Sequence, residues 1–180
     1  MKDMRTGILA AAVTLAAAPA AFAADGTITI NGQVTSQTCT ISGNGGGKDF
    51  TVTLPTVSAS TLATAGAAAG RTPFNIALSK CTPNSGNVST YFEPGATVDT
   101  TTGRLVNTAP GGAANVQVGL LNSDNSSIQL GAAQASQNSK PVALSGGAAT
   151  LNYYAQYVAT GGAATAGSVT TTTLYSIVYQ

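Results

Sequence analysis

The chain has 180 residues, and its seven basic and six acidic side chains give a formal net charge of +1. This near balance of charge argues against a nucleic-acid partner, because phosphate binding depends mainly on clustered Lys and Arg. The chain contains no histidine, so catalytic sites of the Ser-His-Asp and Cys-His types lack their usual general base.

The first 23 residues have the pattern of an export signal. Two basic residues precede an apolar run, and an A-x-A cleavage site at residues 21–23 follows it. A membrane anchor or a buried helix is the alternative interpretation, but the run is too short to cross a bilayer. We therefore expect residues 1–23 to be a signal peptide and Ala24 to begin the mature chain.

Segments that alternate apolar and polar residues follow one another along the rest of the chain, separated by Gly, Asn, Ser, Thr and Pro. This pattern is typical of an antiparallel all-β domain, and about seven short strands favour an immunoglobulin-like sandwich. The alanine-rich segment 58–70 could form a short helix, but its glycines favour an extended loop. Strands are expected at 27–41, 50–54, 74–79, 88–92, 116–121, 149–158 and 170–179.

The first expected strand carries an apolar stripe that one glycine interrupts. Its even positions are Ile28, Ile30, Gly32 and Val34, and the polar odd positions face the other way. The pattern alone leaves two interpretations open. The segment is either the first strand of the sandwich, with Gly32 at a bulge, or a free strand that adds to the sheet of another chain.

Both cysteines, Cys39 and Cys81, lie in the part of the chain that export would carry into an oxidising compartment. One disulfide is therefore expected, and in the chain-entropy model it would stabilise the fold by about 4 kcal/mol. A two-cysteine metal site is the alternative, but the chain has no histidine to complete it.

The last expected strand is rich in β-branched and aromatic residues. Its odd positions Thr173, Tyr175, Ile177 and Tyr179 would share one face. With no later strand to flank it, one side of its backbone would be an exposed edge or would pair with another chain.

Nothing in the sequence indicates catalysis. The acidic residues stand singly, with no close pair of the kind that divides acid and base roles in a glycosidase. We expect no enzymatic activity, no cofactor and no metal.

Four stretches and the C-terminus together resemble the major pilin subunits of chaperone-usher (type 1-like) fimbriae. "GTITINGQVTSQTC" is similar to the N-terminal extension of that family and its first cysteine, and "PFNIALSKC" to the segment with the second cysteine. "NVQVGLLNSDNSSIQL" and "LNYYAQYVATGGAATAGS" also resemble family segments. The C-terminus has the glycine of the family fourteen residues from the end, Gly167, and its penultimate aromatic, Tyr179.

The resemblance implies an incomplete immunoglobulin-like sandwich that lacks its last strand and is completed by donor-strand complementation. Residues 24–35 would form the donor-strand extension, with Ile28, Ile30, Gly32 and Val34 as the donor stripe, and residues 36–180 the pilin domain. A periplasmic chaperone would fill the groove until, at an outer-membrane usher, the extension of the next subunit replaces it. The acceptor groove and chaperone-binding strand would comprise Gly167, Thr173, Tyr175, Ile177, Tyr179 and Gln180.

The function that this implies is structural. The chain would be a subunit of a bacterial surface fimbria used in adhesion, exported through the periplasm and joined head to tail with identical or related pilin subunits. A minor adaptor or tip-associated subunit of the same kind of fimbria is the alternative, because adaptors share the one-domain plan.

Overall fold

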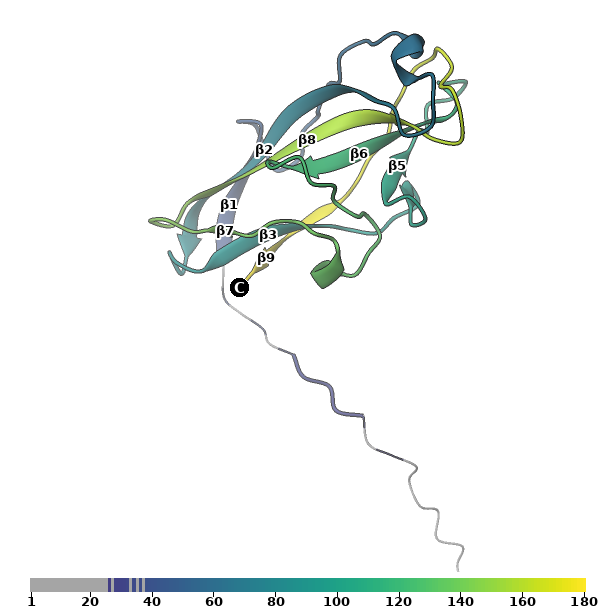
Figure 1. Cartoon of the computed structure of the whole chain (residues 1–180). Coiled ribbons are helices and arrows are strands. Elements are labelled where there is room, and N and C mark those ends of the chain that lie inside the picture. Colours follow the sequence, from purple (N-terminus) through teal and green to yellow (C-terminus); the bar gives the residue numbers. More distant parts are fainter. Residues whose placement is uncertain (1–25, 27, 33, 35, 37) are drawn as a thin grey trace, which may run out of the picture. The chain divides into compact units, whose positions relative to one another are not determined.

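The computed structural model describes residues 26, 28–32, 34, 36 and 38–180 (Figure 1). The expected signal peptide, residues 1–23, lies outside the described residues. Contacts divide the chain into two units, and the second, Thr35–Gln180, contains every strand that the structure describes. No helix in the described part of the chain is long and apolar enough to span a membrane.

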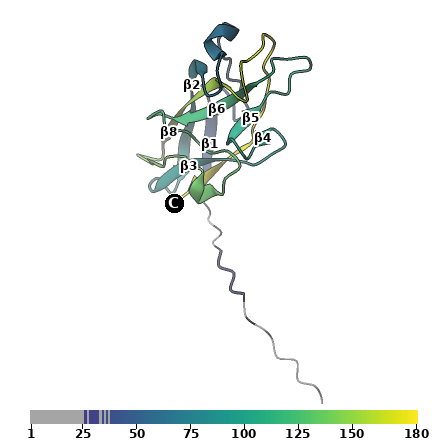
Figure 2. The ribbon, with the colours of Figure 1, turned by 45° about the vertical axis from the view of Figure 1, so that its right-hand side comes forward.

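The domain is a sandwich of two antiparallel sheets, as the alternating sequence pattern predicts. The larger sheet has the order β1-β2-β8-β6-β5-β4 and the smaller the order β7-β3-β9. Figure 2 shows the short strands β4 and β5 at the margin of the larger sheet. The strands are β1 (Thr38–Gly43), β2 (Ala68–Thr82), β3 (Asn87–Phe92), β4 (Val98–Asp99), β5 (Arg104–Val106), β6 (Val116–Asn122), β7 (Val142–Ala143), β8 (Ala149–Ala159) and β9 (Tyr175–Tyr179).

The core lies between the two sheets. The long strands β2 and β8 form its centre, where Ile76 is paired with Leu151, and both side chains are fully buried. Val88 of β3 and Leu120 of β6 belong to the same apolar cluster, so both sheets contribute to it. Alternation along each strand therefore directs one set of side chains inward, which is the physical basis of the sandwich.

Two expected strands form only in part, and a third does not form. The strand expected at 170–179 begins at Tyr175. The strand expected at 27–41 begins at Thr38, and the described residues before it have no strand structure. Residues 50–54 are extended and alternate between half-buried and exposed, but they belong to no ladder. The structure also contains β4, β5 and β7, which are too short to produce a recognisable alternation in the sequence.

The alanine-rich segment differs from the extended loop that the sequence favours. It contains a short 3-10 helix, η1 (Ala59–Leu62), and its end already belongs to β2. The Ser58 side chain caps η1 by accepting a hydrogen bond from the Ser60 N–H, and Leu62 is buried in a second, smaller apolar cluster. The glycines of the segment, Gly66 and Gly70, lie beyond η1 and so do not oppose it. A second 3-10 helix, η2 (Gln134–Ser136), lies between β6 and β7.

Candidate functional site: an apolar groove beside the last strand

An apolar groove of about 820 Å³ separates two extended segments, residues 48–54 and 169–175. Its floor consists of side chains that also form the core, including Phe74 and Ile76 of β2 and Phe92 of β3. The sandwich is therefore open along this line, with buried core residues of both sheets beneath the opening.

The first wall of the groove alternates buried and exposed side chains as a strand does, but it pairs with no neighbouring strand that the structure describes. Phe50, Val52 and Leu54 are half-buried against the core, while Thr51 and Thr53 are exposed. Among the described residues, none forms a backbone–backbone hydrogen bond with residues 50–54. The backbone of this wall thus has free N–H and C=O groups along the groove.

The second wall ends at Tyr175, the first residue of β9, which is the edge strand of the smaller sheet. The later site residues predicted from the sequence, Ile177, Tyr179 and Gln180, lie beyond the groove lining. Gln180 exchanges both backbone hydrogen bonds with Asn87 (2.8 and 2.9 Å), and the Leu174 C=O accepts one from the Glu93 N–H (2.8 Å). In an antiparallel ladder, alternate residues bond to opposite sides. The backbone groups of the odd positions Thr173, Tyr175, Ile177 and Tyr179 therefore face away from β3, toward the free edge.

The side chains of these odd positions share one face. Tyr175, Ile177 and Tyr179 are half-buried and pack against the core, and Thr173 is half-buried in the groove wall. Leu174, on the other face, is 76% exposed. Two free backbone edges with an apolar floor between them form a site that one additional strand would complete.

Gly167 lies outside the groove lining, at the start of the segment that leads into the second wall. A Cβ at this position would overlap the backbone of Ala113. The close approach allows the following residues to dock, since the Ala113 N–H donates to the Ser168 C=O (2.9 Å) and the Thr108 N–H to the Thr170 C=O (2.8 Å). Gly167 thus positions the wall rather than lining it.

One contact that the sequence does not indicate joins the two walls. The Tyr175 hydroxyl donates a hydrogen bond to the Lys48 C=O (2.7 Å), and the Tyr175 ring packs edge to face with Phe50 at 6.1 Å between centroids. Burial, together with the negative charge of Asp49, raises the pKa of the Tyr175 phenol above its ordinary value. The ring of Phe50 in turn lies against Gly43, where a Cβ would overlap it.

The proposed donor stripe belongs to the N-terminal unit. Ile28 and Ile30 are each 89% exposed and Val34 is fully exposed, while no heavy atom lies within 4 Å of a Cβ built on Gly32. Three large apolar side chains in water are unfavourable, at about 1.5 to 3 kcal/mol each relative to full burial. The stripe therefore has a strong tendency to bind an apolar surface.

The expected disulfide is present. Cys39 of β1 and Cys81 of β2 are bonded, with an S–S distance of 2.06 Å. The bond lies where the pairing of the two strands is irregular, between the pairs Thr38 with Thr82 and Thr40 with Ser79. It fixes β1, and with it the start of the segment that leads to the first wall.

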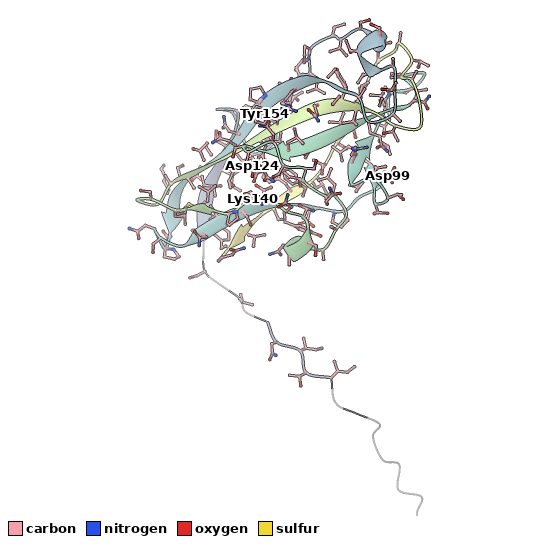
Figure 3. All side chains as sticks on the ribbon, in the orientation of Figure 1. Asp99, Asp124, Lys140 and Tyr154 are labelled. Atoms are coloured by element: carbon pink, nitrogen blue, oxygen red, sulfur yellow. A yellow bond between two sulfur atoms is a disulfide. The ribbon has the colours of Figure 1, made fainter. Side chains whose placement is uncertain are left out.

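In the part of the chain that the structure describes, the acidic side chains do not gather at a second site. Figure 3 shows Asp99 well apart from Asp124 and Lys140. Hydrogen bonds, the largest from Gln117, lower the pKa of Asp99, and those from Ser126 lower the pKa of Asp124. Among the described residues, no group of three or more His, Cys, Asp or Glu could hold a metal ion.

Comparison with known proteins gives a consistent result. The family model of the type-1 fimbrial protein FimA matches residues 54–180. The chain is 60% identical over 172 residues to the major fimbrial subunit SMF-1 of Stenotrophomonas maltophilia (strain K279a), covering 92% of this chain and 99% of that protein. It is 51% identical to the F17 fimbrial protein of Escherichia coli, covering 97% and 96% of the two chains.

Solved structures agree at the level of the fold. A subunit in a chaperone-usher pilus structure matches with a TM-score of 0.61 at 20% identity, over 91% of this chain and 100% of that chain. The P pilus rod subunit PapA matches with a TM-score of 0.60 at 20% identity, over 79% and 99%. The sandwich described above is thus similar to the immunoglobulin-like fold of chaperone-usher pilins.

Proposed function

The chain belongs to the type-1 fimbrial protein family and is a structural fimbrial subunit, and from this premise we propose that it polymerises by donor-strand exchange as the repeating subunit of the shaft. Members of this family are structural proteins rather than enzymes. The observation that carries the proposal is the groove, with free backbone edges on both walls and core residues in its floor.

In this proposal, residues 24–35 of one subunit supply the strand that the domain of the next subunit lacks. Ile28, Ile30 and Val34 would contact the apolar floor, and Gly32 would dock at a narrow point of the groove, as the family resemblance implies. The backbone of the donor would pair with the free edge of Thr173, Tyr175, Ile177 and Tyr179. Because the contact is head to tail and does not close on itself, it generates a filament.

Before assembly, the exposed groove requires protection. We propose that a periplasmic chaperone lends a strand to the same edge, with Tyr179 and Gln180 among the residues it contacts, and that an outer-membrane usher then promotes the exchange. An open apolar groove of this kind is an aggregation hazard in a free subunit, which gives the chaperone a physical purpose. The description of the relative SMF-1 as a major fimbrial subunit favours the shaft over a minor adaptor.

A pair of matched substitutions in the donor stripe tests this proposal. Ile30→Asp would place a charge against the apolar floor, at a cost of several kcal/mol, and we expect it to abolish fibres. Thr29→Asp adds the same charge to the neighbouring residue, on the opposite face of the strand, and should leave fibres intact. Electron microscopy of the cells and the amount of subunit in sheared fibres measure the difference.

The subunit itself provides the control. Because Ile30 is exposed and lies outside the domain, Ile30→Asp should leave the periplasmic amount of disulfide-bonded subunit unchanged. Equal fibre formation by both variants would contradict the donor role of the stripe, as would an equal loss of fibres in both.

A further inference from the structure

The sequence contains two Asn-Gly pairs, Asn31 with Gly32 and Asn44 with Gly45, and the structure places them in opposite environments. Glycine after asparagine matters chemically, because a residue without a Cβ lets its backbone nitrogen approach the asparagine side chain closely. Such a pair is prone to deamidation wherever the backbone is free to rotate.

Asn31 has this freedom. Its side chain is exposed, and the residue has no regular secondary structure. The neighbouring Gly32 has open space around it, with no heavy atom within 4 Å of the position of a Cβ. None of the described residues is placed to oppose the approach of the Gly32 nitrogen to the Asn31 carboxamide.

Asn44 is held on both sides by Asn75. The Asn44 Oδ1 accepts a hydrogen bond from the Asn75 N–H (2.9 Å), and the Asn44 N–H donates to the Asn75 C=O (3.0 Å). The residue lies in a turn with φ of 48°, so its backbone and its side chain are both fixed. Ring closure at Asn44 would require this turn to open first.

We propose that Asn31 is a deamidation site of the unassembled subunit, and that its modification disables the donor strand. The backbone nitrogen of Gly32 attacks Cγ of Asn31, the new N–Cγ bond replaces the bond from Cγ to Nδ2, and ammonia leaves with the proton of the Gly32 N–H. Water then opens the resulting succinimide to aspartate or isoaspartate. Water is the only other reactant, and no oxidant or reductant is required.

The two products differ in their effect on the donor stripe. Asn31 lies on the face opposite Ile30 and Gly32, so the carboxylate of aspartate would stay outside the groove. Isoaspartate instead adds one methylene group to the backbone, and a shift of strand register reverses the direction of the side chains that follow. Ile28 and Ile30 could then no longer face the floor together with Val34. This consequence rests on the proposed function, whereas the chemistry does not.

The experiment follows the two asparagines in the purified exported chain, incubated in mildly alkaline buffer and sampled over time. Peptide mapping by mass spectrometry measures conversion of each amide to an acid, and the retention times of synthetic standards separate aspartate from isoaspartate. We expect Asn31 to convert at least about tenfold faster than Asn44. At Asn44 the turn must first open locally, and this opening costs free energy. Equal rates, or an Asn31 that stays an amide, would overturn the proposal.

Matched variants then connect the chemistry to assembly. Asn31→Gln keeps an amide on the same face but closes the ring far more slowly, so the aged variant should form fibres as fast as the fresh one. Aged wild-type chain should lose fibre growth in proportion to its isoaspartate content, and fresh Asn31→Asp should grow normally. Equal loss of growth in aged wild-type chain and aged Asn31→Gln would refute the link between modification and assembly.

The experiment distinguishes a failure of the proposed function from a failure of the deamidation chemistry. If fibre growth is unaffected even in chains that are fully converted to isoaspartate, the segment is not the donor strand, and the part of the inference concerning assembly falls with it. The chemical part would still be decided by the ratio of the two conversion rates. In assembled fibres, donor-strand pairing should protect Asn31, which a peptide map of sheared fibres reports directly.

Discussion

Tyr175 is the residue that connects the two walls of the groove. Its hydroxyl reaches the Lys48 C=O, and its ring packs on Phe50, although Lys48 is 127 residues away in the sequence. This contact helps to hold the free wall in place next to β9. The expected role of Tyr175 is thus to keep the groove in a shape that a strand can enter.

Tyr175→Phe tests this role, because it removes the hydroxyl and keeps the ring. Below pH 10 we expect the variant to be less stable by about 1 kcal/mol or less, the usual net value of one hydrogen bond. Burial raises the pKa of Tyr175 in the folded state, so its stabilising contribution is complete below the ordinary value of 10.0 and is lost as pH rises through the raised pKa.

The measurement is urea unfolding of the two proteins over a series of pH values. The unfolding free energy of the wild type should exceed that of the variant by less above pH 10. In that range Tyr175 ionises readily in the unfolded chain but not in the folded one, which favours unfolding of the wild type alone. Tyr157 and Tyr179 also have raised pKa values and are present in both proteins, so a common alkaline decline should remain. A difference that is constant across the whole pH range would contradict this role of the hydroxyl.

At the scale of the element, the first wall shows how a strand can be held in place without a ladder. Residues 50–54 keep their position through side chains alone, since Phe50, Val52 and Leu54 pack against the core. Phe50 is the anchor, because it contacts both Phe74 and Tyr175 and its ring occupies the space above Gly43. The position of this wall therefore depends on the absence of a side chain at residue 43.

Gly43→Ala should displace Phe50 and with it the first wall. The new Cβ would overlap the Phe50 ring, and overpacking of this kind typically costs about 1 to 3 kcal/mol. We expect a lower unfolding free energy and slower fibre growth than for Gly47→Ala, where the nearest heavy atom to a new Cβ is 3.9 Å away. Similar unfolding midpoints for the two variants would show that the ring of Phe50 is not fixed by Gly43.

At the scale of the whole molecule, the subunit has a core that is open on one side. The floor of the groove is already buried, but the wall side chains Phe50, Val52 and Leu54 are only half-buried, so a strand in the groove would add to the hydrophobic stabilisation. The Cys39–Cys81 bond compensates by joining residues separated by 42 positions, which reduces the conformational freedom of the unfolded chain.

Replacement of both Cys39 and Cys81 by Ala should therefore lower the unfolding free energy of the subunit by about 4 kcal/mol in the chain-entropy model. For a domain with an open groove, this loss should appear as degraded or aggregated subunit in the periplasm. Thiol labelling of denatured wild-type fibres provides the complementary measurement and should detect no free cysteine. Two labelled cysteines per subunit would contradict the structural role of the bond.

Much of this protein follows from the local pattern of its sequence. Alternation with a period of two predicts most of the longer strands, because a strand exposes and buries successive side chains whatever its partners are. The same rule indicates the stripe of Ile28, Ile30 and Val34, and a pair of cysteines that follows an expected export signal indicates the disulfide. These features depend on neighbours in the sequence or on composition, and both can be read without a structure.

Only the tertiary structure decided which extended segments find partners. Residues 50–54 and β9 have equally strand-like sequences, yet only β9 has a ladder partner, because hydrogen-bond pairing depends on what lies beside a segment in space. The bond from Tyr175 to Lys48 and the contact of Phe50 with Gly43 likewise require parts of the chain to approach after folding. The short strands β4, β5 and β7 depend on pairing in the same way, since two or three residues are too few to show a period.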